Sequence, residues 1–168
     1  MEILSFKTTP SNKFVLNCAE IKIQKCYILS KNKTIDVNFK LDTKKELLSI
    51  ISKSKVSGKI KLCIEYTGIL NDRLLGFYRS KYTDPSGKTK YLATTQFEAA
   101  DARRAFPCWD EPATKATFDV SLLVEKNYMA ISNMPIRKKQ NFGSKIIYEF
   151  ERTPIMSTYL LYLGVGEF

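Results

Sequence analysis

The polar side chains that could take part in chemistry gather in the stretch Tyr91–Pro112. Residues 91–98 are rich in β-branched and aromatic residues, which predicts a strand. Gln96 and Glu98 lie two positions apart, so the period of a strand would place both side chains on one face. An amide and a carboxylate that leave a strand side by side predict a binding edge.

The segment after this strand changes character. Residues 99–106 are rich in alanine and end at Pro107, which predicts one short helix of about two turns. We interpret the charged residues around it as a structural carboxylate–guanidinium network that holds the helix on the sheet. A catalytic pair of Asp110 and Glu111 is the alternative, although adjacent residues rarely converge on one substrate. The residues of this network are Asp101, Arg103, Arg104, Asp110 and Glu111.

The sequence contains no histidine. This excludes a zinc helix of the HExxH type, a Ser-His-Asp triad, a Cys-His dyad and any His-ligated metal within the chain. General acid–base chemistry would fall to carboxylates, Lys or Tyr. The sequence therefore predicts no catalytic residue and no metal ligand.

Four cysteines, Cys18, Cys26, Cys63 and Cys108, form no CxxC pair and have no regular spacing. We expect buried free thiols in a reducing, cytoplasmic protein, because no secretory signal is recognisable. A zinc site built from the cysteines is the disfavoured alternative. Cys108 lies between a proline and a tryptophan, which favours packing over nucleophilic chemistry.

The length of 168 residues predicts a single domain over 1–168. The net charge is +10, and its lysines are spread along the chain rather than clustered, which favours a solvated surface over a nucleic-acid partner. The aromatic and basic segment Gly76–Tyr82 could stack nucleobases, but in a β-rich chain cross-strand pairs are the better reading. No apolar run reaches the ~20 residues that cross a bilayer, so we expect no membrane partner.

The elements that must position these residues are strands. Alternating apolar residues mark 20–25, 34–41, 59–66 and 146–150, and turn residues separate them. Residues 42–55 are ambiguous between one helical turn and a strand with a loop. Ser157–Val165 is almost wholly apolar and predicts a segment buried on both faces. The pattern predicts an all-β layered fold of about ten to twelve short strands.

Three stretches carry a resemblance to a known family. TTQFEAADARRAFPCWDEP, at residues 94–112, followed by KATFDVSL, resembles the signature of the M1 family of zinc aminopeptidases, in the domain that precedes their catalytic domain. Gly68–Tyr82 and Thr153–Phe168 are similar to further segments of that domain. The resemblance implies a saddle-shaped, antiparallel multi-stranded β-sandwich. It also favours the strand-and-loop reading of residues 42–55.

In that family this domain forms one wall of the active-site cleft. The resemblance implies that Gln96 and Glu98 bind the first side chain and the free α-amine of a peptide substrate. It implies zinc in a following catalytic domain, which carries a GxMEN loop and an HExxH helix that this chain lacks. We therefore expect the chain to be inactive alone and to require the catalytic domain, in cis or in trans. A non-catalytic scaffold module of the same fold is the alternative.

The beginning of the chain departs from the family. Members usually begin with a further strand or two before the stretch that Glu2–Leu16 resembles. A strand without its neighbour exposes unpaired N–H and C=O groups, so we expect self-association through a free edge. A monodisperse monomer at high concentration would contradict this expectation.

Overall fold

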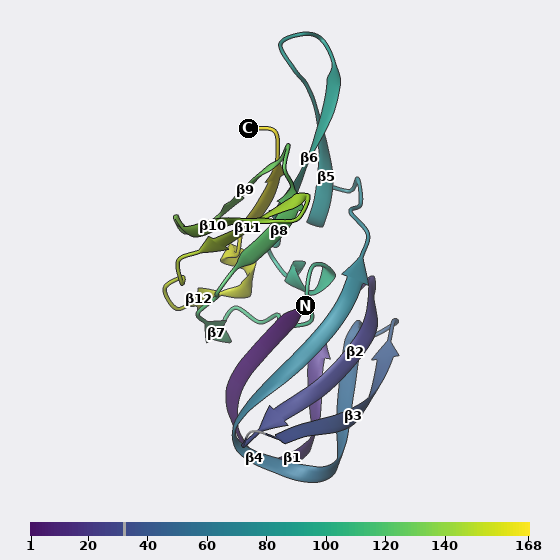
Figure 1. The fold of residues 1–168 in the computed structure, drawn as a ribbon. Helices are drawn as coiled ribbons and strands as arrows, with labels where there is room; N and C mark the ends of the chain where they lie inside the picture. Colours follow the sequence, from purple (N-terminus) through teal and green to yellow (C-terminus); the bar gives the residue numbers. More distant parts are fainter. Residues whose placement is uncertain (32) are drawn as a thin grey trace. The chain divides into compact units, whose positions relative to one another are not determined.

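The computed structural model describes residues 1–31 and 33–168 and is built almost wholly from β-strands, as the sequence predicts (Figure 1). Several antiparallel sheets form, and within the described residues none of them closes into a barrel, which is consistent with a β-sandwich. In chain order the elements are β1 Glu2–Asn17, β2 Ile21–Ser30, β3 Lys33–Asp42, β4 Leu47–Gly68, β5 Gly76–Thr83, β6 Thr89–Gln96, η1 Ala102–Arg104, β7 Lys115–Ala116, β8 Ser121–Glu125, β9 Met129–Ser132, β10 Ile136–Phe142, β11 Lys145–Phe150, β12 Met156–Ser157, η2 Thr158–Leu160 and β13 Leu163–Gly166.

The chain divides into two compact units. Unit 1 consists of Met1–Ile69 and Arg103–Trp109, and unit 2 consists of Leu70–Ala102 and Asp110–Phe168. Each unit has its own sheets and its own cluster of buried apolar side chains. The expectation of a single domain over 1–168 stays a prediction.

Unit 1 is organised by the 22-residue strand β4, which curves along its length (Figure 1). Its first part pairs with β3, its second part pairs with β2, and β1 pairs with both parts. Gly58 lies between the two parts with a φ of +79°, a backbone conformation that glycine adopts without steric cost. The register with β1 shifts between Val56 and Gly58, so β4 can bend there and remain paired with β1.

The core of unit 1 follows from the period of two along these strands. In β4, Ile60, Leu62 and Ile64 are at most 1 % exposed, whereas Lys59 and Lys61 are exposed; Cys63, on the other face of the strand, is buried as well. Ile60 and Leu62 lie opposite apolar residues of the neighbouring strands, whereas Ile64 lies opposite Cys26 of β2 and the carboxylate-bearing Glu2 of β1. Phe14, Leu16, Ile28, Leu48 and Ile50 complete the buried cluster, and Trp109 packs against it.

Strand β1 forms one edge of the unit 1 sheet. Among the described residues it pairs with β4 alone, apart from a bridge at its end where Asn17 and Cys108 exchange backbone hydrogen bonds of 2.7 and 3.0 Å. The remaining polar groups on that side of β1 have no neighbouring strand within residues 1–31 and 33–168. Self-association through this edge stays a prediction.

Unit 2 contains three small sheets. The order β5-β6-β13-β9 forms the first, β10-β11-β8 the second, and β12-β7 the third. The buried side chains of Val124, Ala130, Tyr148 and Phe150 form a core cluster within it. Ser157–Val165 is not one strand buried on both faces: the two-residue strand β12, the turn η2 and β13 divide it, and Leu160 is 49 % exposed.

The predicted helix over 99–106 is wrong in length and type. The structure has a single 3-10 turn at Ala102–Arg104, preceded by a turn in which the Asp101 N–H donates to the Phe97 carbonyl over 3.0 Å. The Arg103 carbonyl accepts from the Ala19 N–H over 2.9 Å instead of continuing a helix. A segment this short cannot offset the cost of helix nucleation, so tertiary hydrogen bonds decide its shape. Residues 42–55 form a turn followed by β4, as the strand-and-loop reading expects.

Candidate binding site at the end of strand β6

The site begins where β6 ends. Gln96 is the last residue of the strand and lies opposite Gly76 of β5, whereas Glu98 lies in the turn that follows. The Glu98 N–H donates a 3.1 Å hydrogen bond to the Gln96 side-chain oxygen, which holds the two residues together. Both side chains are exposed, while Phe97 between them is 1 % exposed. A buried aromatic ring thus anchors a short segment that presents an amide and a carboxylate to solvent.

The Glu98 carboxylate is available to a ligand. Among the residues that the structure describes, no Lys or Arg side chain lies within ion-pair distance of it. An exposed carboxylate beside an amide oxygen can accept hydrogen bonds from an ammonium group, which offers three donors. The arrangement suits the binding of a primary amine better than proton transfer.

The strand that leads into this site is fixed by threonine hydroxyls. The Thr95 hydroxyl accepts from the Leu163 N–H over 3.0 Å, and the Thr94 hydroxyl donates to the Tyr162 hydroxyl over 3.1 Å. β6 also pairs with β13 through Gly164 and Val165. The last segment of the chain therefore holds β6 in place by backbone and side-chain contacts.

The two neighbouring carboxylates, Asp110 and Glu111, lie in different environments. Asp110 is 3 % exposed and accepts a 3.1 Å hydrogen bond from the Thr158 hydroxyl, whereas Glu111 is exposed. The Ser157 hydroxyl donates to the Pro112 carbonyl over 2.6 Å. These contacts fit a structural role for the turn, because a buried carboxylate and an exposed one do not face one substrate together.

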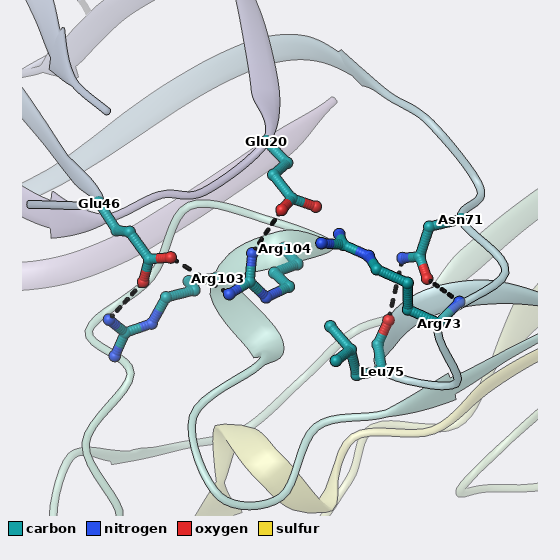
Figure 2. A network of polar contacts seen from close by, with 7 residues as sticks. All are labelled: Glu20, Glu46, Asn71, Arg73, Leu75, Arg103 and Arg104. Atoms are coloured by element: carbon teal, nitrogen blue, oxygen red, sulfur yellow. Dashed lines mark hydrogen bonds and ion pairs between the residues drawn. The ribbon is translucent and has the colours of Figure 1, made fainter. Parts of the chain in front are cut away.

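Arg103 and Arg104 form a second group of charges, within unit 1. Figure 2 shows their guanidinium groups converging on the Glu46 carboxylate, at 3.3 and 3.2 Å. Arg104 also pairs with Glu20 at 2.8 Å. Both glutamates lie in turns with a positive φ, +58° at Glu20 and +54° at Glu46. The ion pairs tie residues 103–104 to the turns that join the strands of unit 1.

The charge pattern of residues 101–111 predicts acidic partners for the two arginines within that same stretch. The partners Glu20 and Glu46 were missed, because they lie 84 and 58 residues away from Arg104 in the chain. The sequence gives one indication of these partners: both glutamates lie between segments of alternating apolar residues, where turns are expected. The structural role predicted for Arg103, Arg104, Asp110 and Glu111 stays a prediction that substitution can test.

We expect Arg104→Ala to destabilise the protein by about 1–2 kcal/mol, since it leaves two glutamates in turns without one of their cations. Arg152→Ala is the matched control, because Arg152 also makes a two-contact pair, with Asp119, but both side chains are more than 60 % exposed. The control should cost less than about 1 kcal/mol, as exposed pairs do. Urea unfolding of both variants measures the difference, and equal losses would contradict a fixing role for Arg104.

Two of the buried thiols, Cys18 and Cys26, are weak nucleophiles. All four cysteines are free and buried. Burial, with a contribution from Glu2, raises the pKa of the Cys18 thiol to about 11. Burial, with a contribution from Cys63, raises the pKa of Cys26 to about 12. A thiol with so high a pKa is not a thiolate at neutral pH, so it is a weak nucleophile and a poor metal ligand.

The residues of this chain do not fit a zinc ion. Within residues 1–31 and 33–168, no group of three or more His, Cys, Asp or Glu side chains is placed to hold a metal ion, and the sequence has no histidine. No helix of the described chain is both long and apolar enough to cross a membrane.

Comparisons with known proteins identify a family of similar domains. The sequence model described as the Peptidase M1 N-terminal domain matches residues 3–160. The chain is 41 % identical over 170 residues to "Aminopeptidase 2" of Candida albicans, an alignment that covers 99 % of this chain and 18 % of that protein. It is 38 % identical over 161 residues to "Aminopeptidase M1-B" of Oryza sativa, which covers 96 % of this chain and 18 % of the relative.

A third relative is more similar over a shorter stretch. The chain is 54 % identical over 108 residues to "Alanine/arginine aminopeptidase" of Saccharomyces cerevisiae, covering 64 % of this chain and 13 % of that protein. The chain therefore spans less than a fifth of the length of the curated relatives that it matches.

Proposed function

Because the chain belongs to the family of Peptidase M1 N-terminal domains, we propose that it forms the substrate-binding wall of a zinc-dependent aminopeptidase. In this proposal Glu98 pairs with the α-ammonium group of a peptide and Gln96 contacts the first side chain. The reaction that follows removes the N-terminal residue, and it takes place in a catalytic domain joined to this chain in cis or in trans.

The observation that carries the proposal is the pairing of Gln96 and Glu98 in one exposed, anchored turn. An ammonium group needs a carboxylate partner, and the Glu98 carboxylate is not occupied by a cation among the described residues. An exposed carboxylate alone binds an amine only weakly, because water screens the pair. A catalytic domain that closes over the site would exclude water and strengthen the same pair.

Zinc would be held by the catalytic domain, where it would polarise the peptide bond and activate a water molecule. Among the residues that the structure describes, none are grouped to hold the ion, and in this proposal the chain binds and orients the amino end of the substrate. The proposal therefore includes that the chain alone does not hydrolyse peptides. Its location with a cytoplasmic enzyme is part of the same proposal.

A graft into a relative tests the proposal. The segment of Candida albicans "Aminopeptidase 2" that aligns with this chain is replaced by residues 1–168, and hydrolysis of aminoacyl-anilides is measured. We expect activity from the graft and none from the chain alone. Hydrolysis by the chain alone would overturn the proposed division of roles. A graft that folds and retains zinc but does not hydrolyse the substrate would favour a non-catalytic scaffold.

A further inference from the structure

Several lysines lie near one another on the unit 1 sheet. Lys59 and Lys61 lie two residues apart on β4, so their side chains leave the same face of the strand. Lys7 of β1 lies directly opposite Lys59 in the antiparallel register. Lys31 follows β2 at the turn toward β3. These four residues, Lys7, Lys31, Lys59 and Lys61, are named the lysine cluster below.

Three members of the cluster surround a hollow. Lys31, Lys59 and Lys61 line a depression of about 450 Å³, whose remaining lining residues are the apolar Leu29 and Ile60. Lys61 lies opposite Leu29 of β2 on one side and opposite Ser5 of β1 on the other. All the residues of the hollow belong to unit 1, so its shape follows from the pairing of β2 and β4. The volume is within the range of small-ligand sites, ~300–1,000 Å³.

The charges of the cluster are not neutralised by the protein. None of the four lysines takes part in an ion pair or side-chain hydrogen bond among the described residues. Like charges directly opposite each other in an antiparallel pair are destabilising, and Lys7 and Lys59 form such a pair. An anion bound between the ammonium groups would remove this repulsion.

We propose that the hollow binds a compact, soluble anion that carries several phosphate groups. A lysine ammonium group binds phosphate as a point charge, without the fixed geometry of an arginine. A cluster of lysines can therefore bind a flexible polyphosphate in several arrangements. Of the two apolar lining residues, Leu29 lies beside Lys61 on the neighbouring strand, whereas Ile60 is 1 % exposed and belongs to the core, so the charged groups that could recognise a ligand are the lysines. This inference is independent of the proposed peptide site, because it concerns unit 1 alone.

The second hollow of the described structure carries no such proposal. It lies in unit 2, holds about 410 Å³ and is lined by Asp72, Arg79 and Tyr91 among others. Arg79 is already neutralised by two hydrogen bonds to Asp72, at 2.8 and 2.9 Å, and lies over the Tyr91 ring. A cation that is already paired within the protein attracts an anionic ligand less strongly than an unpaired cation does.

Calorimetric titration with inorganic tripolyphosphate tests the proposal on the full chain. We expect saturable binding at low salt that weakens as sodium chloride is added, since the contacts are electrostatic. The double variant Lys59→Gln/Lys61→Gln should bind about tenfold more weakly. The matched control, Lys126→Gln/Lys138→Gln, makes the same charge change at exposed lysines of unit 2 and should bind as the unchanged chain does.

A second measurement separates a site from general attraction. Without ligand at low salt, Lys59→Gln should raise the melting temperature, because it removes the repulsion with Lys7. Tripolyphosphate should raise the melting temperature of the unchanged chain more than that of the double variant. Equal loss of affinity in the control, or no binding at millimolar tripolyphosphate, would overturn the proposal. Binding only to vesicles that contain phosphatidylinositol bisphosphate would likewise overturn it in favour of a membrane surface.

Discussion

Glu2→Gln is expected to stabilise the protein at pH 8 by several kcal/mol and to flatten the dependence of stability on pH. Glu2 lies on β1, and its side-chain oxygen Oε2 is buried without a hydrogen-bond partner among the described residues. Burial raises the pKa of the Glu2 carboxyl to about 8, a rise that the N-terminal amine partly offsets. At neutral pH the folded protein therefore holds Glu2 largely as the neutral acid.

The sign of the effect follows from the protons that each state binds. Between about pH 4.5 and 8 the folded state keeps the Glu2 proton and the unfolded state loses it. The stabilisation is fully present below pH 4.5 and is lost as the pH rises through 8. The expected slope across this window is about 1.4 kcal/mol per pH unit. Gln keeps the shape of the protonated side chain but cannot ionise, so this contribution disappears.

The groups around Glu2 strengthen the effect rather than reverse it. Glu2 raises the pKa of both Cys18 and Tyr66, and Cys108 also contributes to the rise at Tyr66. Burial is the largest cause at each of these two groups, so all of them favour their neutral forms. An ionised Glu2 would meet acidic neighbours in the core, with the N-terminal amine as the only opposing charge that shifts it.

Urea unfolding at pH 5, 6, 7 and 8 measures the effect. The unchanged chain should lose stability as the pH rises, and Glu2→Gln should remove most of that loss. Asp36→Asn, at an exposed carboxylate on β3 of the same unit, should leave the slope unchanged. If Glu2→Gln has the same slope as the unchanged chain, the Glu2 carboxyl has the same pKa in the folded and unfolded states, and the prediction is wrong.

The sequence predicted the sheets well because burial on one face imposes a period of two. In β4, Ile60, Leu62 and Ile64 are buried at every second position, and the neighbouring Lys59 and Lys61 are exposed. Such a pattern is local, so it can be seen without knowing which strands pair. The segment 99–106 shows the opposite case. Its alanines favour a helix, but the Arg103 carbonyl accepts a hydrogen bond from the Ala19 N–H. A contact between residues so far apart in the chain cannot be predicted from the local sequence.

The candidate site was predictable in its residues but not in its surroundings. Gln96 and Glu98 stand out by type and spacing, yet Glu98 lies beyond the strand, and the hydrogen bond between them runs from the Glu98 backbone N–H to the Gln96 side-chain oxygen. The partners of Arg104 come from two distant turns, at Glu20 and Glu46. Contacts of this kind depend on the tertiary pairing of strands, which the period of a sequence does not specify.

Glu98→Gln in the active graft is expected to lower kcat/KM for peptide substrates by about 100-fold. The change keeps the size of the side chain and removes its charge, so the α-ammonium group loses an ionic partner. Once the catalytic domain excludes water, a charge-assisted hydrogen bond of this kind contributes ~1.5–3 kcal/mol. Gln96 should matter less, because its side-chain oxygen already accepts from the Glu98 N–H. Glu151→Gln, at an exposed carboxylate of the same unit, should leave kcat/KM unchanged.

A pair of inhibitors distinguishes recognition of the amine from general damage to the graft. One inhibitor is an amino-acid analogue with a free α-amine, and the other is the same compound with hydrogen in place of the amine. Glu98→Gln should weaken binding of the first inhibitor about 100-fold and leave the second unchanged, because only the first presents an ammonium group. If both inhibitors weaken equally, Glu98 supports the fold of the cleft and does not bind the amine. The free, fixed carboxylate at the end of β6 would then need another ligand.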